Sequence, residues 1–304
     1  MSGMAVVVVS YNTRDLLDEC LASARAEGAS EIVVVDVGST DGSVEMVRAD
    51  HRMVTIVETV GNPGYGSAAN AGVSRCDAEH VLLLNADTVI RPGAVAVLHR
   101  YLNDHDSVGL CGPRLVYPDG RSQHSCFPFP GSVGWLLEND PLLPVAGLIP
   151  PLRRRLLHYA PPSTATAVPW VLGAALAFRR RAFESVGGFD PDFFMYFEEV
   201  DLCRRLADSG WATHFVPHAT VVHVGGASTR QAHPRMMVAH FRSTIRFYRK
   251  HHRGVQLQFW LAVMRLKVLA RIGQDAFLLL LQPRGRTRRR ERLVAWRRAL
   301  REGR

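Results

Sequence analysis

Short apolar runs alternate with helical patterns through the first third of the chain. The runs are rich in β-branched residues and have the length of buried strands: Ala5–Val9, Ile32–Val35, Thr55–Thr59 and Val81–Leu84. Helices are predicted between them, at Leu16–Ala26, Val44–Arg48 and Ser67–Ser74. This alternation predicts an α/β fold with a doubly wound, mainly parallel sheet. The ligand crevice of such a sheet lies beyond the carboxyl ends of its strands.

The alternation weakens after about residue 110. Pro113–Pro169 is rich in proline and glycine, which predicts loops and short helices around the crevice. Regular elements are predicted again further on, at Val171–Phe178, Val200–Ser209, Val221–Val224, Met236–His251 and Val255–Leu281. We expect a sheet domain over residues 1–252, divided at about residue 112, and a helical extension over 253–304.

Positive charge is concentrated at the end of the chain. The net charge is +9, and residues 284–304 hold ten Arg and two Glu, which is +8 of that total. Residues 1–283 are therefore close to neutral, so the body of the protein need not bind a polyanion. No recognition module accompanies the arginines, and we expect no nucleic-acid partner.

The helical extension combines apolar and cationic residues. Val255–Leu281 is apolar on most sides, but Arg265, Lys267 and Arg271 interrupt it, and a membrane span needs about 18–20 uncharged residues. The arginines that follow, with Trp296 among them, suit an anionic headgroup region. We expect peripheral attachment to the inner face of the cell membrane. Packing on the rest of the chain or on a second subunit is the alternative, so an oligomer stays open.

The cysteines and the first residues indicate a reducing compartment. The five cysteines are odd in number, scattered, and form no CxxC pair. This argues against a disulfide framework and fits the cytoplasm. The chain enters a strand-like run at once, without a basic leader, so no signal peptide is expected.

Polar residues follow three of the predicted strands. Ser10-Tyr11-Asn12 follows the first strand, Asp36 the second and Asn85-Ala86-Asp87 the fourth. Asp36 could accept a hydrogen bond from a pyrimidine N–H, and Asp87 could hold a divalent cation through its hard oxygens. Asp and Asn also start turns for local reasons, which is the alternative for any single one of them.

The segment from Gly64 to Ala69 matches the dinucleotide fingerprint G-x-G-x-x-A. A lone match of this kind is weak evidence. Here Asn62-Pro63 precedes it and would interrupt the strand that the fingerprint should follow. The sequence therefore gives little support to a nicotinamide or flavin site.

Acids and aromatic residues are interleaved from Phe189 to Asp201, just before a predicted helix. Carboxyl groups beside apolar rings are partly desolvated, which raises their proton affinity and suits a general base. The alternative is a helix start at which the helix dipole favours acids.

Further on, His223 ends a strand before Gly225-Gly226, where it could approach a metal–phosphate group closely. A structural histidine is the alternative.

These motifs together resemble glycosyltransferase family 2, which has the GT-A fold, and within it the bacterial rhamnosyltransferase-like branch. The resemblance extends from about Val6 to His252. The motifs that carry it are Ser10-Tyr11-Asn12, Asp36 with Ser39 and Asp41-Gly42, Gly64 to Gly66 with Asn70, Asn85-Ala86-Asp87, Gly173-Ala174, Gly187 to Asp190, Phe197 to Leu202 and His223 to Ser228.

The resemblance implies roles for residues on both sides of the crevice. On the donor side, Asp36 looks like the reader of the base, with Ser10, Tyr11, Asn12, Gly64, Asn70, Asn85 and Ala86 around the nucleotide. Asp87 and His223 look like ligands of Mg²⁺ or Mn²⁺. Glu199 occupies the place of the catalytic base, with Gly173, Ala174, Glu198 and Asp201 on the acceptor side. Residues 1–252 would form the catalytic domain, binding nucleotide before about residue 112 and acceptor after it.

The implied activity is inverting, metal-dependent sugar transfer from a nucleoside diphosphate to an acceptor hydroxyl. The branch suggests L-rhamnose from dTDP-rhamnose and an acceptor in a lipid-linked or cell-envelope glycan. A UDP-sugar donor is the alternative. A sugar nucleotidyltransferase fits less well, because it is expected to carry a glycine-rich, basic phosphate loop where this chain has Ser10 to Thr13. Three departures from the family pattern are Val37 for a common Asn, Asn85 for an acid, and Glu199 for a more usual Asp.

Overall fold

Two compact units make up the chain in the computed structural model, which describes residues 3–132, 135, 148–150, 162–225, 233–281 and 286–302. The sheet unit comprises Met1–Asp192 and Glu199–Ser228. The helical unit comprises Phe193–Glu198 and Thr229–Arg304. The chain therefore leaves the sheet unit just before Phe193 and returns to it at Glu199.

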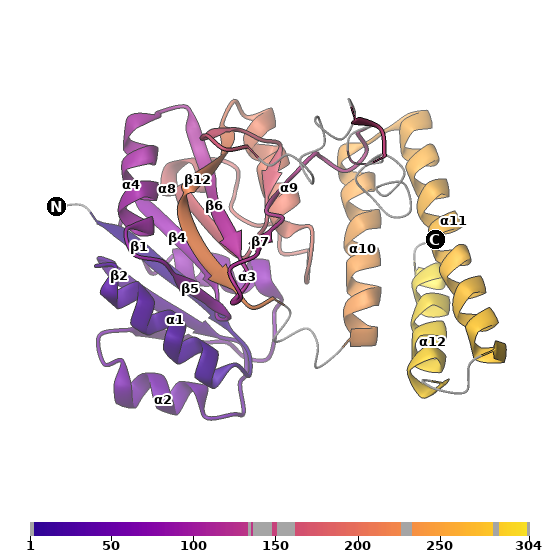
Figure 1. Ribbon diagram of the computed structural model, residues 1–304, viewed down its shortest axis with the longest axis horizontal. Coiled ribbons are helices and arrows are strands. Elements are labelled where there is room, and N and C mark those ends of the chain that lie inside the picture. The colour runs from indigo at the N-terminus through magenta and orange to yellow at the C-terminus, as the bar shows by residue number, and fades with distance from the viewer. Residues whose placement is uncertain are drawn as a thin grey trace. The chain divides into compact units, whose positions relative to one another are not determined.

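One large mixed sheet forms the centre of the sheet unit (Figure 1). Its main path runs β3-β2-β1-β4-β11-β6-β12-β5, with β7 paired to β6 and β9 to β12. The strands are β1 (Met4–Ser10), β2 (Glu31–Asp36), β3 (Thr55–Glu58), β4 (His80–Asn85), β5 (Thr88–Ile90), β6 (Val108–Val116), β7 (Ser122–Gln123), β9 (Thr166–Ala167), β11 (Ala175–Arg179) and β12 (Ala212–His223). Two further short strands, β8 (Cys126–Phe127) and β10 (Trp170–Val171), pair with each other.

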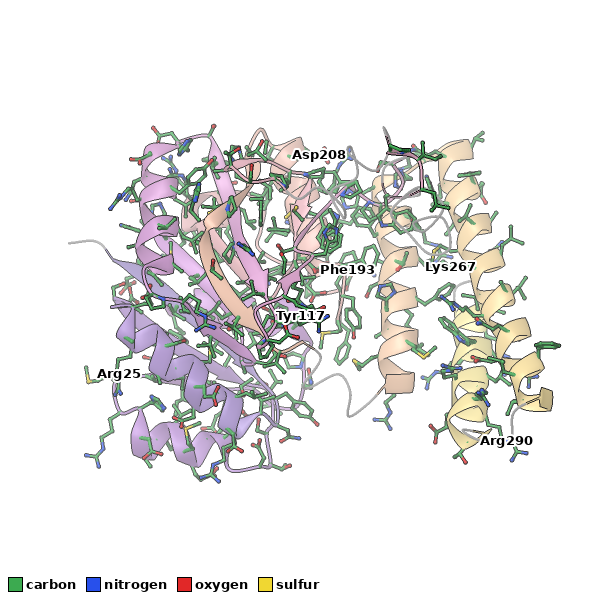
Figure 2. All side chains as sticks on the ribbon, viewed as in Figure 1. Arg25, Tyr117, Phe193, Asp208, Lys267 and Arg290 are labelled. Atoms are coloured by element: carbon green, nitrogen blue, oxygen red, sulfur yellow. The ribbon has the colours of Figure 1, made fainter. Side chains whose placement is uncertain are left out.

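Helices cover both faces of this sheet. They are α1 (Arg14–Ala26), α2 (Ser43–Asp50), α3 (Tyr65–Val73), α4 (Ala94–Asp104), α8 (Arg180–Ser185) and α9 (Glu198–Asp208). Successive side chains of β1 point to opposite faces, so Met4, Val6 and Val8 pack with α1, α2 and α4, whereas Ala5 and Val7 pack with α3, α8 and α9. Side chains fill the space between sheet and helices (Figure 2). The sequence-predicted α/β class with a doubly wound sheet is confirmed.

The structure differs from the sequence prediction after residue 85. The single element expected at Val171–Phe178 is two strands, β10 and β11, separated by residues 172–174. Strand β6 continues through Pro113 into the stretch expected to be loops. Pro113 does not end the strand. It is paired with Val216 of β12 at an irregularity in the ladder, and the pairing of β6 with β12 continues on both sides of this irregularity. Residues 136–147 and 151–161 of the same stretch lie outside the described residues.

Three helices form most of the helical unit: α10 (His233–His251), α11 (Gly254–Leu281) and α12 (Arg286–Glu302). Each contacts the other two. The arginine-rich tail is therefore a helix with a packed side, on which Ala295 and Ala299 are buried. Helix α10 belongs to this unit, whereas the sequence placed the start of the extension after residue 252. None of the described helices is long and apolar enough to cross a membrane.

Helix α3 lies unusually close to the sheet at Gly72. A Cβ atom there would come 2.5 Å from Cγ1 of Val7 and 2.7 Å from Cγ2 of Val35. We expect Gly72→Ala to lower the free energy of unfolding by about 1–3 kcal/mol, because the core cannot take the extra methyl without strain. Urea denaturation followed by circular dichroism measures the change.

Gly273→Ala is the matched control for this substitution. Gly273 also lies within a helix, α11, but nothing stands within 4 Å of the added Cβ. It should leave stability unchanged or raise it by up to about 1 kcal/mol, because alanine is the better helix former. Equal effects of the two substitutions would contradict the close packing of α3.

Candidate active site

The parallel register brings polar ends of neighbouring strands to one edge of the sheet. Ser10 is paired with Asp36, and Val9 with Asn85. Asp36 is 3% exposed, and its Oδ1 accepts hydrogen bonds from the backbone N–H groups of Gly38 (3.0 Å) and Ser39 (2.8 Å). Its Oδ2 is buried with no hydrogen-bond partner in the described structure. A buried acceptor without a partner is costly, so this oxygen is suited to an N–H donor of a ligand.

The loops after β1 and β2 are tied together through Asn12. Its backbone adopts a left-handed conformation (φ 48°), and its N–H donates to Ser39 Oγ at 2.9 Å. Its Oδ1 accepts from the Thr40 N–H at 2.7 Å. Tyr11, next to it, is 36% exposed, whereas Ser10 is buried. This network fixes the rim of the crevice beside Asp36.

Asp87 and His223 come together from opposite ends of the sequence. Strand β12 pairs with β5, which places His223 opposite Thr88, and the Val224 N–H donates to the Asp87 carbonyl at 3.0 Å. His223 Nε2 lies 3.4 Å from Asp87 Oδ1, and both side chains are almost fully buried. On its other side, Nδ1 of His223 lies 2.9 Å from Gln123 Oε1.

This pair has the chemistry of a partial divalent-cation site. If Gln123 Oε1 accepts a hydrogen bond from Nδ1–H, the lone pair of His223 Nε2 points to the side of Asp87. Within the described residues no group of three or more His, Cys, Asp or Glu side chains forms a complete metal site. Two protein ligands are nevertheless enough for Mg²⁺ or Mn²⁺ when substrate phosphates and water fill the other positions.

Glu199 lies at the start of α9 against the turn between β10 and β11. A Cβ on Gly173 would be 3.3 Å from both Cδ and Oε1 of Glu199, so any larger residue there would press on this carboxyl group. The next residue, Ala174, accepts a hydrogen bond from the Asn85 N–H at 3.0 Å. Residues 173 and 174 therefore connect Glu199 to the strand end that carries Asn85.

The surroundings of Glu199 favour its protonated form. Burial raises the pKa of this carboxyl above its ordinary value, although hydrogen bonds from the backbone at Glu199, Gly173 and Val200 oppose the effect. Its Oε2 is buried and has no hydrogen-bond partner among the described residues. A carboxyl of raised pKa with one oxygen available can accept a proton from a bound hydroxyl.

Phe193–Glu198, the segment immediately before Glu199, is held by α10 within the helical unit. Ser243 Oγ donates to the Met195 carbonyl at 2.8 Å. Tyr196 and Phe197 both have left-handed backbones, with φ of 67° and 68°, and the ring of His240 packs against both of theirs. Two adjacent non-glycine residues in this conformation are strained and persist only when their surroundings hold them. Helix α10 therefore fixes the segment that precedes Glu199 in the chain.

Four other residues singled out in the sequence are placed by contacts within the protein. Both groups of the Asn70 side-chain amide bond to the backbone of Phe189, at 2.8 and 2.9 Å. Asp201 is fully buried and accepts from Arg205 Nε at 2.7 Å. Gly64 precedes the first turn of α3, and Glu198 is buried. Direct ligand contacts for these four residues stay predictions.

Gln123 and Tyr65 were not identified as site residues from the sequence. Gln123 lies on a two-residue strand inside a proline-rich stretch and belongs to no motif. Tyr65 stands within the matched glycine motif, and its hydroxyl donates to the Gly173 carbonyl at 3.2 Å. Both act through long-range contacts, which leave no local signal in the sequence.

Comparison with known proteins gives consistent matches over most of the chain. Residues 2–250 match the family described as "Glycosyltransferase like family 2". N-acetylglucosaminyl-diphospho-decaprenol L-rhamnosyltransferase of Mycobacterium tuberculosis is 30% identical over 303 residues, covering 95% of this chain and 96% of the relative. Rhamnosyltransferase WbbL of Escherichia coli is 21% identical, covering 80% and 91%.

A solved structure shares the fold. The mannosyltransferase PcManGT from Pyrobaculum calidifontis, in complex with GDP-Man and Mn²⁺, superposes with a TM-score of 0.58 at 19% identity. The match covers 98% of this chain and 86% of that one. At 19% sequence identity, this structural similarity establishes the fold of the chain and not its substrates.

We expect Gln123→Ala to weaken Mn²⁺ binding by about 10–100-fold, because His223 would lose the hydrogen bond that orients it. Asp87→Ala should weaken binding further, since it removes a ligand. Electron paramagnetic resonance of Mn²⁺ titrated into the protein measures both. Gln256→Ala, on an exposed turn of α11, is the control and should bind like the wild type. Wild-type affinity in Gln123→Ala would remove Gln123 from the site.

Proposed function

Since the chain belongs to glycosyltransferase family 2 and is a glycosyltransferase with a GT-A type α/β fold, we propose that it transfers L-rhamnose from dTDP-rhamnose to a hydroxyl group of a lipid-linked acceptor. The observation that carries the proposal is the match to the mycobacterial L-rhamnosyltransferase along nearly the full length of both chains. That relative's name specifies a diphospho-decaprenol-linked acceptor. A UDP-sugar is the alternative donor.

The donor site is built at the edge formed by β1, β2 and β4. Asp36 Oδ2 accepts from the N3–H that thymine and uracil share, so this contact selects a pyrimidine without separating the two donors. Asp87 and His223 would hold Mg²⁺ or Mn²⁺. When bound, the cation offsets the negative charge of the leaving diphosphate.

Glu199 is the general base in the proposed reaction. Its Oε2 takes the proton from the acceptor hydroxyl as that oxygen forms a bond to the anomeric carbon, and the bond from this carbon to the diphosphate oxygen breaks. One displacement of this kind inverts the anomeric centre. Gly173 positions the base, because its missing side chain leaves room for the carboxyl group.

The helical unit attaches the enzyme to an anionic membrane in this proposal. Five large apolar side chains form a stripe along α11 at spacings of four, seven, three and eight residues. They are Val255, Phe259, Leu266, Leu269 and Phe277, and all are more than half exposed. Exposed arginines on α12, among them Arg290 (Figure 2), add positive charge to the same unit. The surplus charge disfavours a second copy of the unit and favours an anionic lipid surface as the partner of the stripe.

We expect Glu199→Gln to lower the rate of sugar transfer by roughly 10²–10⁴-fold and to leave donor affinity unchanged, because the amide keeps the shape and loses the basicity. Single-turnover kinetics with dTDP-rhamnose measure the rate. Glu199→Asp, which keeps a carboxylate, should retain much more activity. A Gln variant within a few-fold of the wild type would remove Glu199 as the base.

The pH dependence of transfer follows from the raised pKa of Glu199. The base must be ionised, so kcat/KM should fall on the acid side with an apparent pKa above 4.5, the ordinary value for a glutamate. Activity is thus gained as the pH rises through the raised pKa. An acid limb at or below pH 4.5 would contradict a desolvated base.

Membrane binding is tested with vesicles that contain anionic lipid. The triple variant Arg290→Gln/Arg297→Gln/Arg301→Gln should bind roughly 100-fold more weakly, at about 1 kcal/mol for each cation near the surface. The control Arg25→Gln/Arg52→Gln/Arg75→Gln removes the same charge from exposed positions of the sheet unit. Equal loss in both variants would contradict binding through α12. Dimerisation that is abolished by Leu266→Ser would assign the stripe to a second copy.

A further inference from the structure

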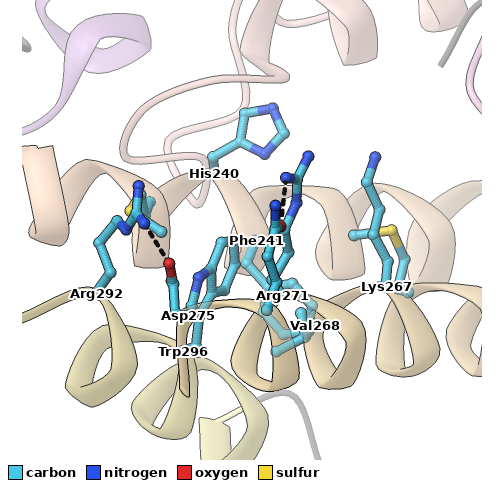
Figure 3. Close-up of a pocket in the computed structure, with 11 residues that line it drawn as sticks. His240, Phe241, Lys267, Val268, Arg271, Asp275, Arg292 and Trp296 are labelled. Atoms are coloured by element: carbon cyan, nitrogen blue, oxygen red, sulfur yellow. Dashed lines mark hydrogen bonds and ion pairs between the residues drawn. The ribbon is translucent and has the colours of Figure 1, made fainter. Parts of the chain in front are cut away.

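The helical unit contains a cavity of about 460 Å³ that the proposed reaction does not use (Figure 3). Its described lining residues come from α10, α11 and α12. Its polar lining consists mainly of His240, Lys267, Arg271, Asp275 and Arg292. Trp296, Phe241, Met264 and Val268 provide apolar walls. The cavity thus combines charged and apolar walls, which suits a ligand that has both a charged group and an apolar part.

Among the described lining residues, positive charge exceeds negative charge. Lys267, Arg271 and Arg292 carry three positive charges and Asp275 one negative charge, which gives a net +2 from these four residues. Asp275 is 5% exposed and is paired with Arg292, yet Nε of Arg292 is buried without a hydrogen-bond partner in the described structure. Arg271 bonds to the neutral amide of Gln274 at 3.2 Å. The guanidinium groups therefore keep donors for an anion.

His240 connects the cavity to the segment before Glu199. Desolvation by its neighbours and the positive charge of Lys267 lower the pKa of His240, so its ring is neutral near pH 7. No hydrogen bond engages either ring nitrogen among the described residues. The same ring packs on Tyr196 and Phe197, whose strained backbone leads to Glu198 and Glu199. A ligand in the cavity would thus touch the residue that supports this segment.

We propose that this cavity binds the diphosphate group of the lipid-linked acceptor. Arg271, Arg292 and Lys267 would contact the phosphate oxygens, and Trp296 with its apolar neighbours would contact the first part of the lipid chain. Phosphate oxygens match the planar fork of a guanidinium, and two linked phosphates can use two such groups. The identity of the acceptor rests on the proposed function, whereas the binding of a diphosphate to this cavity does not.

Calorimetric titration with inorganic diphosphate and with a short-chain prenyl diphosphate tests the site directly. Divalent cation is left out, so that the Asp87–His223 pair holds no diphosphate through a metal. Arg271→Gln should weaken prenyl diphosphate binding by about tenfold or more, because one charge-assisted contact is lost. Arg265→Gln removes the same charge from an exposed position of the same helix and should stay within about twofold of the wild type.

Two outcomes would overturn the site. One is the absence of binding of either diphosphate to the wild type, and the other is equal weakening by Arg271→Gln and Arg265→Gln, which would indicate general attraction by charge. Equal affinity for inorganic and prenyl diphosphate would show that the lipid chain adds nothing to binding, and would contradict a lipid-linked diphosphate as the ligand. In sugar transfer, Arg271→Gln should raise the KM for the acceptor about tenfold with little change in the KM for the donor.

A further variant separates this inference from the proposed function. Asp87→Ala should abolish sugar transfer and keep wild-type affinity for prenyl diphosphate. If the wild type transferred no sugar at all but showed the binding pattern above, the proposed function would fail and the diphosphate site would stand. The nuclear magnetic resonance signal of His240 gives a second readout, since a bound diphosphate should raise the pKa of this ring.

Discussion

Parallel hydrogen bonding of β1 to both β2 and β4 is the constraint on which the candidate active site depends. It aligns Ser10 with Asp36 and Val9 with Asn85. The three strands β1, β2 and β4 therefore end at the same edge of the sheet, and the residues that follow them lie along that edge. Strand β12 then returns His223 to that edge opposite Thr88, beside Asp87. Side chains far apart in sequence meet because buried strands tolerate only one register, in which each apolar side chain faces its own layer of helices.

The short segment from Phe193 to Glu198 belongs to the helical unit, although the residues on both sides of it belong to the sheet unit. The chain enters the helical unit there, is held by Ser243 and His240 of α10, and re-enters the sheet unit at Glu199. Glu199, the proposed base, thus belongs to the sheet unit, whereas the segment immediately before it contacts α10 of the helical unit.

The sequence predicted the parts of the molecule whose signals are local. Buried apolar runs predicted β1, β2 and β4, and the polar residues Asp36 and Asp87 lie at strand ends as expected, while their roles stay predictions. Gln123 was not predicted, because it orients His223 across a hundred residues of sequence. The turn that divides Val171–Phe178 was missed because the close contact of Gly173 with Glu199 joins residues that lie far apart in sequence. The cavity depends on the packing of three helices, which apolar periodicity does not specify.

The anomeric configuration of the product distinguishes a single displacement at the anomeric carbon from other courses of the reaction. The products of dTDP-rhamnose and a prenyl-diphosphate-linked acceptor can be followed by nuclear magnetic resonance as they form. A single displacement assisted by Glu199 predicts release of dTDP and a rhamnoside whose anomeric configuration is opposite to that of the donor. A product that retains the donor configuration, or release of pyrophosphate in place of dTDP, would contradict the account.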